Sequence, residues 1–174
     1  MSIKHKPENH FDFIGKENAE KIRIGVAVAE WNSEITKALL DSCTETLKKY
    51  QITEEQIIIK WVPGSFELPL AAQWLFEYMN VDAVACLGCI IKGETPHFHF
   101  ISDAVAHAIC DVGLKYNRTV SFGIITAEKE DHALERAGGS KGNKGEEAAM
   151  AILRMLRVKF DLKENSGIKP IGFR

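Results

Sequence analysis

Four apolar, strand-like stretches alternate with helical stretches along this chain, and this alternation constrains its fold more than any other feature. The predicted strands are residues 22–28, 56–62, 82–91 and 119–126. The predicted helices begin near residue 33 and then cover residues 66–79, 96–116, a segment from about 129, and residues 146–160. Strands that alternate with helices in this way form a parallel sheet with helices on both faces. We therefore predict an α/β fold of three layers, α/β/α, around a four-stranded parallel sheet.

The helical stretches carry apolar residues at helical spacing, which predicts their buried faces. In the first helix this stripe consists of Ile35, Leu39, Cys43 and Leu47. Asn32 or Ser33 is expected to cap the same helix. In the second helix we expect the inward-facing residues to be Phe66, Leu70, Trp74 and Leu75.

The length and composition fit one globular domain. The chain has 174 residues, of which 45% are hydrophobic and 26% charged, and a chain of this length buries roughly 70% of its unfolded surface. We place the domain at residues 21–160, with an N-terminal arm at residues 1–20 and a polar C-terminal tail at residues 161–174. A stretch rich in glycine and lysine, residues 138–145, is expected to be a flexible joint between the last two helices.

The composition also disfavours several classes of protein. The formal net charge is −2, so no basic excess points to nucleic acid or to an anionic membrane. No stretch approaches the ~20 apolar residues of a membrane helix, and the N-terminus lacks a signal-peptide core, so we expect a cytoplasmic protein. Cys86 and Cys89 lie three residues apart in a predicted strand and should point to opposite faces, which favours two buried apolar side chains over a metal site.

The predicted ligand site lies just after the strands, because ligands of parallel α/β sheets bind beyond the carboxyl ends of the strands. Trp31 follows the first strand and is either a stacking surface for a flat heterocycle or an aromatic residue of the core or of an interface. After the second strand, Ser65 and Glu67 either hydrogen-bond the hydroxyl groups of a ligand or simply begin a helix.

The third strand leads through residues 92–96 to a histidine at a predicted helix start. A helix N-terminus offers unpaired N–H groups and a partial positive charge, and it therefore binds anions such as phosphate. His97 can transfer protons there near neutral pH, whereas His99 lies about 200° further round the helix and cannot serve the same centre. The alternative is a plain connecting loop, and the Glu94 carboxylate would repel phosphate. Together these residues indicate an enzyme that acts on a phosphorylated small molecule.

Arg136 is the remaining candidate for binding an anion. Its guanidinium group can clamp a phosphate through two hydrogen bonds, or it can merely favour a helix C-terminus. The glycine-rich loop after it is not a Walker A motif, and no GxGxxG follows the first strand. The sequence therefore does not favour a nucleotide or dinucleotide site.

Five motifs, in order along the chain, resemble the lumazine synthase family of riboflavin biosynthesis. They are W-N, P-G-S-F-E-L-P, G-C-I-I-K-G-E-T-P-H-F, S-F-G-I-I-T and E-R-A-G…G-N-K-G, within residues 22–156. The resemblance implies a flavodoxin-like fold and no metal or organic cofactor. It implies condensation of 5-amino-6-(D-ribitylamino)uracil with L-3,4-dihydroxy-2-butanone 4-phosphate to 6,7-dimethyl-8-ribityllumazine, with release of phosphate and water.

The resemblance also implies the roles of individual residues. His97 would be the catalytic proton-transfer group. The pyrimidine would be bound by Trp31, Ser65, Phe66, Glu67, Cys89, Ile90, Ile91 and, from a neighbouring subunit, Phe122. Phosphate would be bound by Gly93, Glu94, Thr95, Arg136 and Lys144. Glu94 and Ser140 depart from the residues that are usual in the family.

Two alternatives stay open at this point: an archaeal-type riboflavin synthase, and a non-catalytic flavin-binding shell protein with the same fold. The resemblance further implies a homo-oligomer built as a closed five-fold ring. The short joint at residues 138–145 favours a sixty-subunit icosahedral shell over a free pentamer, and riboflavin synthase is an expected partner. Apolar residues left over for subunit contacts are expected to include Trp74 and Phe76.

Overall fold

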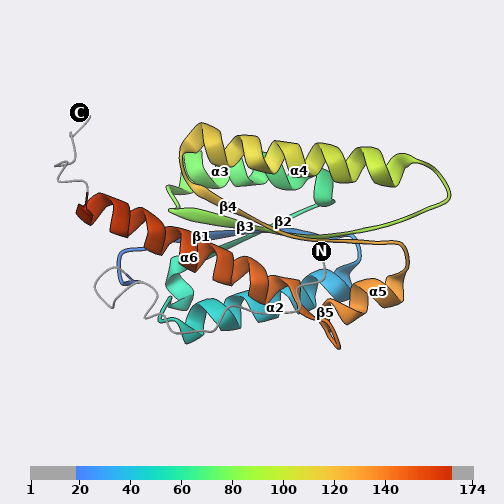
Figure 1. Cartoon of the computed structure of the whole chain (residues 1–174), viewed down its shortest axis with the longest axis horizontal. Coiled ribbons are helices and arrows are strands. Elements are labelled where there is room, and N and C mark those ends of the chain that lie inside the picture. Colours follow the sequence, from blue (N-terminus) through green and yellow to red (C-terminus); the bar gives the residue numbers. More distant parts are fainter. Residues whose placement is uncertain (1–18, 166–174) are drawn as a thin grey trace.

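The computed structural model describes residues 19–165, and it shows one four-stranded parallel sheet between two layers of helices (Figure 1). The strands are β1 (Ile24–Ala29), β2 (Ile57–Val62), β3 (Ala83–Ile91) and β4 (Thr119–Ala127). Their order is β2-β1-β3-β4, so β2 and β4 are the edge strands. This is the order of the first four strands of a flavodoxin-like sheet. The predicted α/β/α fold is confirmed.

The helices of the described segment follow the strands in turn. They are α2 (Ser33–Lys49), α3 (Leu68–Met79), α4 (His97–Tyr116), α5 (Glu130–Glu135) and α6 (Lys144–Asn165). Short 3₁₀ turns, η1 (Glu54–Gln56) and η2 (Ser65–Glu67), precede β2 and α3. Figure 1 shows α3 and α4 on one face of the sheet and α2 and α6 on the other. Between residues 19 and 165, no helix has the length and apolarity needed to cross a membrane.

Each face of the sheet carries its own apolar core, because the two central strands are buried on both sides. Every residue of β1 is buried, and so are the first seven of β3. Strands covered on both faces are expected to be almost wholly apolar, as these are. Cys86 packs in the core beneath α3 and α4, whereas Cys89 packs in the core beneath α2 and α6. The prediction that these two cysteines are buried and point to opposite faces is confirmed.

The apolar stripe predicted for the first helix is buried as expected: Ile35, Leu39, Cys43 and Leu47 all face the sheet. At its amino-terminal end, α6 approaches α2 closely enough that a Cβ on Gly145 would lie 1.9 Å from the carbonyl oxygen of Leu39. Glycine is therefore required at position 145 for these two helices to pack.

The buried face predicted for the second helix is wrong for three of its four residues. The side chains of Phe66, Leu70 and Trp74 are half exposed, and only Leu75 is buried. The residues that face the core are instead Leu68, Ala71, Ala72, Leu75 and Phe76. The helix is apolar on two sides, and the side that carries Leu75 and Phe76 packs against the sheet while the side that carries Leu70 and Trp74 remains outside. For the same reason Phe76, expected at a subunit contact, is in the core.

The predicted flexible joint is an ordered β-hairpin made of β5 (Ala137–Gly139) and β6 (Gly142–Asn143). Gly138 and Gly142 have φ values of 120° and 83°, which only glycine adopts readily. The backbone N–H of Lys141 donates to the Glu135 carbonyl at 3.0 Å and that of Lys144 donates to the Arg136 carbonyl at 2.9 Å. These bonds fix the position of Arg136 relative to α6.

The last helix is longer than predicted, because α6 begins at Lys144 and continues to Asn165. The first five residues of the predicted tail are therefore helical. Residues 166–174, the rest of that tail, lie outside the described residues, and so do residues 1–18 of the predicted arm.

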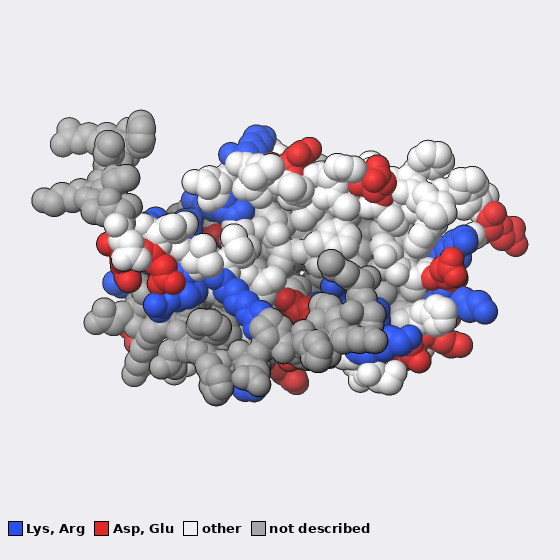
Figure 2. Space-filling view, viewed as in Figure 1, with Lys and Arg blue, Asp and Glu red and all other residues white. Residues whose placement is uncertain are grey.

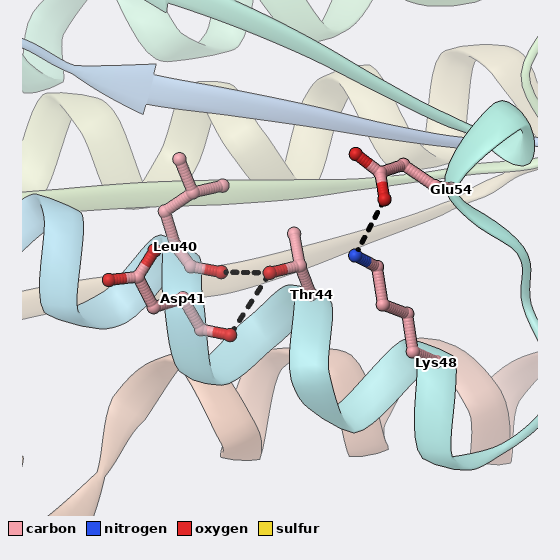
Figure 3. Close-up of polar contacts among 5 residues, drawn as sticks. All are labelled: Leu40, Asp41, Thr44, Lys48 and Glu54. Carbon is pink, nitrogen blue, oxygen red and sulfur yellow. Dashed lines mark hydrogen bonds and ion pairs between the residues drawn. The ribbon is translucent and has the colours of Figure 1, made fainter.

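The connection between α2 and β2 lies at the amino end of the sheet, away from the predicted site. An ion pair links the end of α2 to η1 there (Figure 3). Lys48 Nζ lies 3.0 Å from Glu54 Oε2, and the Thr44 hydroxyl donates to the carbonyls of Leu40 and Asp41, each at 3.0 Å. The ion pair is well exposed, so it contributes at most about 1 kcal/mol.

Candidate active site

The loops after β1 and β2 are joined to each other at the carboxyl edge of the sheet. The backbone N–H of Glu30 donates to the Val62 carbonyl at 2.8 Å, and that of Trp31 donates to the Pro63 carbonyl at 3.2 Å. The two loops therefore continue the pairing of their strands by two more residues. This brings Trp31 directly beside the 63–67 turn.

Trp31 is a surface residue, with 71% of its side chain exposed. The alternative that it is a core aromatic is therefore wrong for the isolated chain. One part of the indole ring lies against Gly64, since a Cβ on that glycine would be 2.9 Å from the Trp31 Cε3 atom. The rest of the ring is available to a ligand or to another subunit.

Asn32 contributes in a way that the sequence did not reveal. It occupies the N-cap position of α2 in the left-handed conformation, with φ 59°, but its side chain makes no capping bond. Instead, its Nδ2 donates to the carbonyl oxygen of Cys89 at 3.1 Å. Asn32 thus ties the end of β1 to the end of β3 and fixes the backbone next to Trp31.

Hydrogen bonds made by the side chains of Ser65 and Glu67 hold the 65–67 turn in place. The Glu67 carboxylate accepts from the N–H of Gly64 at 3.0 Å, so Glu67 stabilises the start of the turn. The Ser65 hydroxyl is buried and donates a weak bond to the Cys89 carbonyl at 3.5 Å. Ser65 fits there only because Gly88 lacks a side chain, since a Cβ at position 88 would lie 2.5 Å from its Oγ. Phe66, between Ser65 and Glu67 in the chain, is exposed.

Cys89 itself offers no reactive thiol. Burial raises the pKa of its thiol to about 12, with the nearby Glu130 carboxylate adding to the effect. Its backbone carbonyl is the shared acceptor of the Asn32 and Ser65 side chains. Ile90 and Ile91 follow it as half-buried residues at the end of β3.

The loop from Lys92 to Pro96 is open to solvent, and His97 is the exposed first residue of α4. No atom lies within 4 Å of the position that a Cβ on Gly93 would occupy. Pro96, the N-cap residue, supplies no side-chain hydrogen bond to the helix start. The loop and the first turn of α4 therefore have both the space and the amide groups to receive an anion.

Arg136 and Lys144 are brought together by a residue that the sequence analysis missed. Arg136 Nη2 lies 3.6 Å from Glu147 Oε1, and Lys144 Nζ lies 2.8 Å from Glu147 Oε2. All three side chains are only about a quarter to a third exposed. Glu147 looks in the sequence like an ordinary acidic residue of a first helical turn, so only the fold reveals this bridge.

Phe122 lies apart from the other candidate residues of the same chain. It pairs with Cys86 in the middle of the sheet, on edge strand β4. The five residue-to-residue steps from Phe122 to Ala127 correspond to about 16 Å along the strand. Its side chain is 36% exposed, so it is available to a molecule that packs against this edge.

Titratable groups that could bind a metal are not clustered. Among residues 19–165, no three His, Cys, Asp or Glu side chains lie close enough together to hold an ion. The segments that follow β1, β2 and β3 at the carboxyl edge carry an aromatic ring, a carboxylate, backbone amides and an imidazole. They suit a planar polar ligand and an anion.

Comparison with known proteins identifies the family. The model of the 6,7-dimethyl-8-ribityllumazine synthase family matches residues 21–159. The chain is 52% identical over 132 residues to the 6,7-dimethyl-8-ribityllumazine synthase of Cytophaga hutchinsonii, which covers 76% of this chain and 83% of that protein. It is 39% identical over 156 residues to the enzyme of the same name from Parabacteroides distasonis, covering 90% of this chain and 98% of that protein. The chain therefore belongs to the 6,7-dimethyl-8-ribityllumazine synthase family.

Proposed function

We propose that this protein is a transferase that condenses 5-amino-6-(D-ribitylamino)uracil with L-3,4-dihydroxy-2-butanone 4-phosphate. The products are 6,7-dimethyl-8-ribityllumazine, phosphate and water. The observation that carries the proposal is the family match across residues 21–159, because this span contains every residue assigned a role in the site. The open loop before α4 and the exposed indole beside the 63–67 turn support it.

The pyrimidine binds at the ends of β1, β2 and β3. Trp31 stacks on the ring, and an aromatic pair of this kind contributes about 1 kcal/mol. Phe66 and Glu67 contact the ring edge and the ribityl chain, whose hydroxyls need hydrogen-bond partners. Ser65 and Cys89 hold the neighbouring residues in place, since both are buried and the Ser65 hydroxyl is hydrogen-bonded to the Cys89 carbonyl. Ile90 and Ile91 supply the apolar wall.

The phosphate binds at the loop before α4. The backbone N–H groups of Gly93, Glu94 and Thr95 donate to it, assisted by the positive end of the helix. The Glu94 side chain is exposed and can point away from the anion. Arg136 and Lys144 supply the compensating positive charge.

His97 transfers protons in the reaction. The amine of the pyrimidine attacks the ketone and water is lost, phosphate is then eliminated, and the second ring closes with loss of a second water. Each of these steps moves a proton, and an imidazole can both accept and donate one. Neutralisation of the phosphate makes it a better leaving group, and holding two reactants together supplies much of the rate.

The complete site is shared between subunits. Phe122 lies on edge strand β4, about 16 Å from the carboxyl end of that strand, so its contact with the pyrimidine comes from a neighbour. The resemblance to the family implies that Arg136 also reaches the phosphate from a neighbour. The outer face of η2 and α3 supports an interface because η2 exposes Phe66 and α3 exposes Leu70, Trp74 and Tyr78. Figure 2 also shows few charged residues over α4 in the view given.

The assembly is a closed pentameric ring, and twelve such rings form a sixty-subunit icosahedral shell. A rotation that closes on itself gives a ring rather than a fibre. The tight hairpin at residues 137–143 supports the shell because it leaves no long loop at this point of the surface. A cytoplasmic location is supported by the four free cysteines, three of them buried. Riboflavin synthase, which would use the product, is the proposed partner.

One assay tests the reaction and its alternatives. The purified protein is supplied either with both substrates or with the lumazine alone, and the fluorescent product and phosphate are measured. Lumazine formed with one phosphate per turnover supports the synthase. Riboflavin formed from the lumazine alone would support the archaeal-type riboflavin synthase, and tight ligand binding without turnover would support a flavin-binding shell protein.

A further inference from the structure

We propose that Gly64 is a positioning residue: it determines where the indole ring of Trp31 lies and thereby how the pyrimidine stacks on it. The inference rests on the proposed function for its effect on substrate binding. The claim that the residue at position 64 determines the orientation of the Trp31 ring rests on the geometry of this chain and does not depend on the reaction.

The backbone at position 64 does not itself require glycine. Gly64 has φ −146° and ψ −178°, an extended conformation that any residue adopts. The reason for glycine at this position must therefore be the space around it. Gly64 is buried even though it lies in a surface turn.

The space that a side chain would need is filled by Trp31 and Glu67. A Cβ on Gly64 would lie 2.9 Å from Trp31 Cε3 and 3.1 Å from Trp31 Cζ3. It would also lie 3.3 Å from Glu67 Oε2. The first distance is shorter than carbon atoms tolerate and the second is tighter than an ordinary contact, since nonbonded carbons are best separated by about 3.5–4.0 Å. One methyl group would therefore displace the ring.

The ring has to rotate, because the backbone of Trp31 is held on both sides. Its N–H bonds to the Pro63 carbonyl at 3.2 Å. The next residue, Asn32, is bonded to the Cys89 carbonyl at 3.1 Å. The contact with Gly64 thus restricts one side of an otherwise exposed ring and leaves the other side for a planar ligand.

Gly64 is also linked to the carboxylate proposed to bind the same substrate. Its N–H donates to Glu67 Oε2 at 3.0 Å. The same short turn therefore sets the relative position of Trp31 and Glu67. A substitution at position 64 should affect the pyrimidine and leave the phosphorylated ketone alone.

The test is Gly64→Ala combined with Trp31→Ala in a double-mutant cycle. In the wild-type background, Gly64→Ala should raise the apparent KM for the pyrimidine about fivefold, the scale of one aromatic contact, with the KM for the phosphorylated ketone unchanged. In the Trp31→Ala background, the same substitution should add less than about twofold, since there is no ring left to displace. A fivefold effect in both backgrounds, or no effect in either, overturns the proposal.

Two further measurements keep the test independent of folding defects and of the reaction. Gly113→Ala is the matched control, since it lies near the carboxyl end of α4, where the atom nearest to an added Cβ is the Arg118 carbonyl oxygen at 3.3 Å and Val120 is at ordinary contact distance. In a Trp61→Phe/Trp74→Phe background, acrylamide quenching of the remaining Trp31 emission should rise with Gly64→Ala and stay constant with Gly113→Ala. Unchanged quenching overturns the positioning role even if the enzyme makes no lumazine. Absence of lumazine with increased quenching would reject the proposed reaction alone.

Gly64→Ala combined with Trp31→Phe serves as the rescue. The Cε3 and Cζ3 atoms belong to the fused six-membered ring of the indole, which phenylalanine lacks. The double variant should therefore bind the pyrimidine as well as Trp31→Phe alone. A double variant that binds much more weakly would show that the added methyl group acts through something other than the indole.

Discussion

Replacement of Arg136 by lysine tests the phosphate site most selectively. It retains the positive charge and removes the planar guanidinium group that can donate two parallel hydrogen bonds. In the structure, one guanidinium nitrogen of Arg136 lies 3.6 Å from Glu147. A lysine can keep an ion pair with Glu147, so the local charge balance should survive. The backbone is also unaffected, since the Arg136 carbonyl accepts from the N–H of Lys144. The change is therefore confined to how the side chain meets an anion.

The expected magnitude follows from the loss of one of two parallel hydrogen bonds. A hydrogen bond to a charged group is worth about 1.5–3 kcal/mol, and the side chain of Arg136 is 31% exposed, so the lower end applies. A loss of about 1.4 kcal/mol corresponds to a tenfold change in affinity. We therefore expect Arg136→Lys to raise the apparent KM for the phosphorylated ketone about tenfold and to leave that for the pyrimidine within twofold.

The assay is steady-state kinetics with each substrate varied in turn. Arg157→Lys is the matched control, because Arg157 is also paired with a carboxylate on α6, at 2.8 Å from Asp161, but lies more than two turns beyond Glu147. The control should leave both KM values unchanged. Equal effects of Arg136→Lys on both substrates would refute a dedicated phosphate role for this residue.

Three further predictions concern His97, the thiols and the assembly. His97→Ala should slow turnover by about 10² or less with an unchanged melting temperature, since amines and ketones also condense unaided; a slower His99→Ala variant would overturn the assignment. At pH 8 an aromatic disulfide reagent should modify at most Cys110 in the native protein, because burial raises the pKa of Cys43, Cys86 and Cys89 to about 12; rapid reaction of a second thiol would contradict this. Light scattering or electron microscopy should find the sixty-subunit shell; a single species of five or ten subunits would exclude the shell, and an active monomer would exclude the shared site.

The strands were predictable because the sheet imposes a simple pattern. A strand covered on both faces must be almost continuously apolar, and β3 is such a strand. The helix faces were harder to predict. Helix α3 is apolar on two sides, and periodicity alone cannot tell the side with Phe76 from the side with Trp74. The choice depends on what packs against the helix, in this chain and in its neighbours.

The positions of Trp31 and His97 were predictable because each follows a strand that the sequence reveals, while their roles stay predictions. The candidate site was not predictable where a residue acts through the fold. Asn32 looks like a helix cap, yet its side chain binds the Cys89 carbonyl 57 residues away. Gly64 looks like a turn glycine, yet its backbone is extended and its smallness serves the indole.

The most direct measurement is the joint requirement for the two substrates, with product and phosphate counted in the same reaction. The purified full-length protein should form fluorescent lumazine only when the pyrimidine and the phosphorylated ketone are both present, and it should release one phosphate for each lumazine. Folded, assembled protein that forms no lumazine from this pair, or that releases phosphate without forming it, would contradict the proposed reaction.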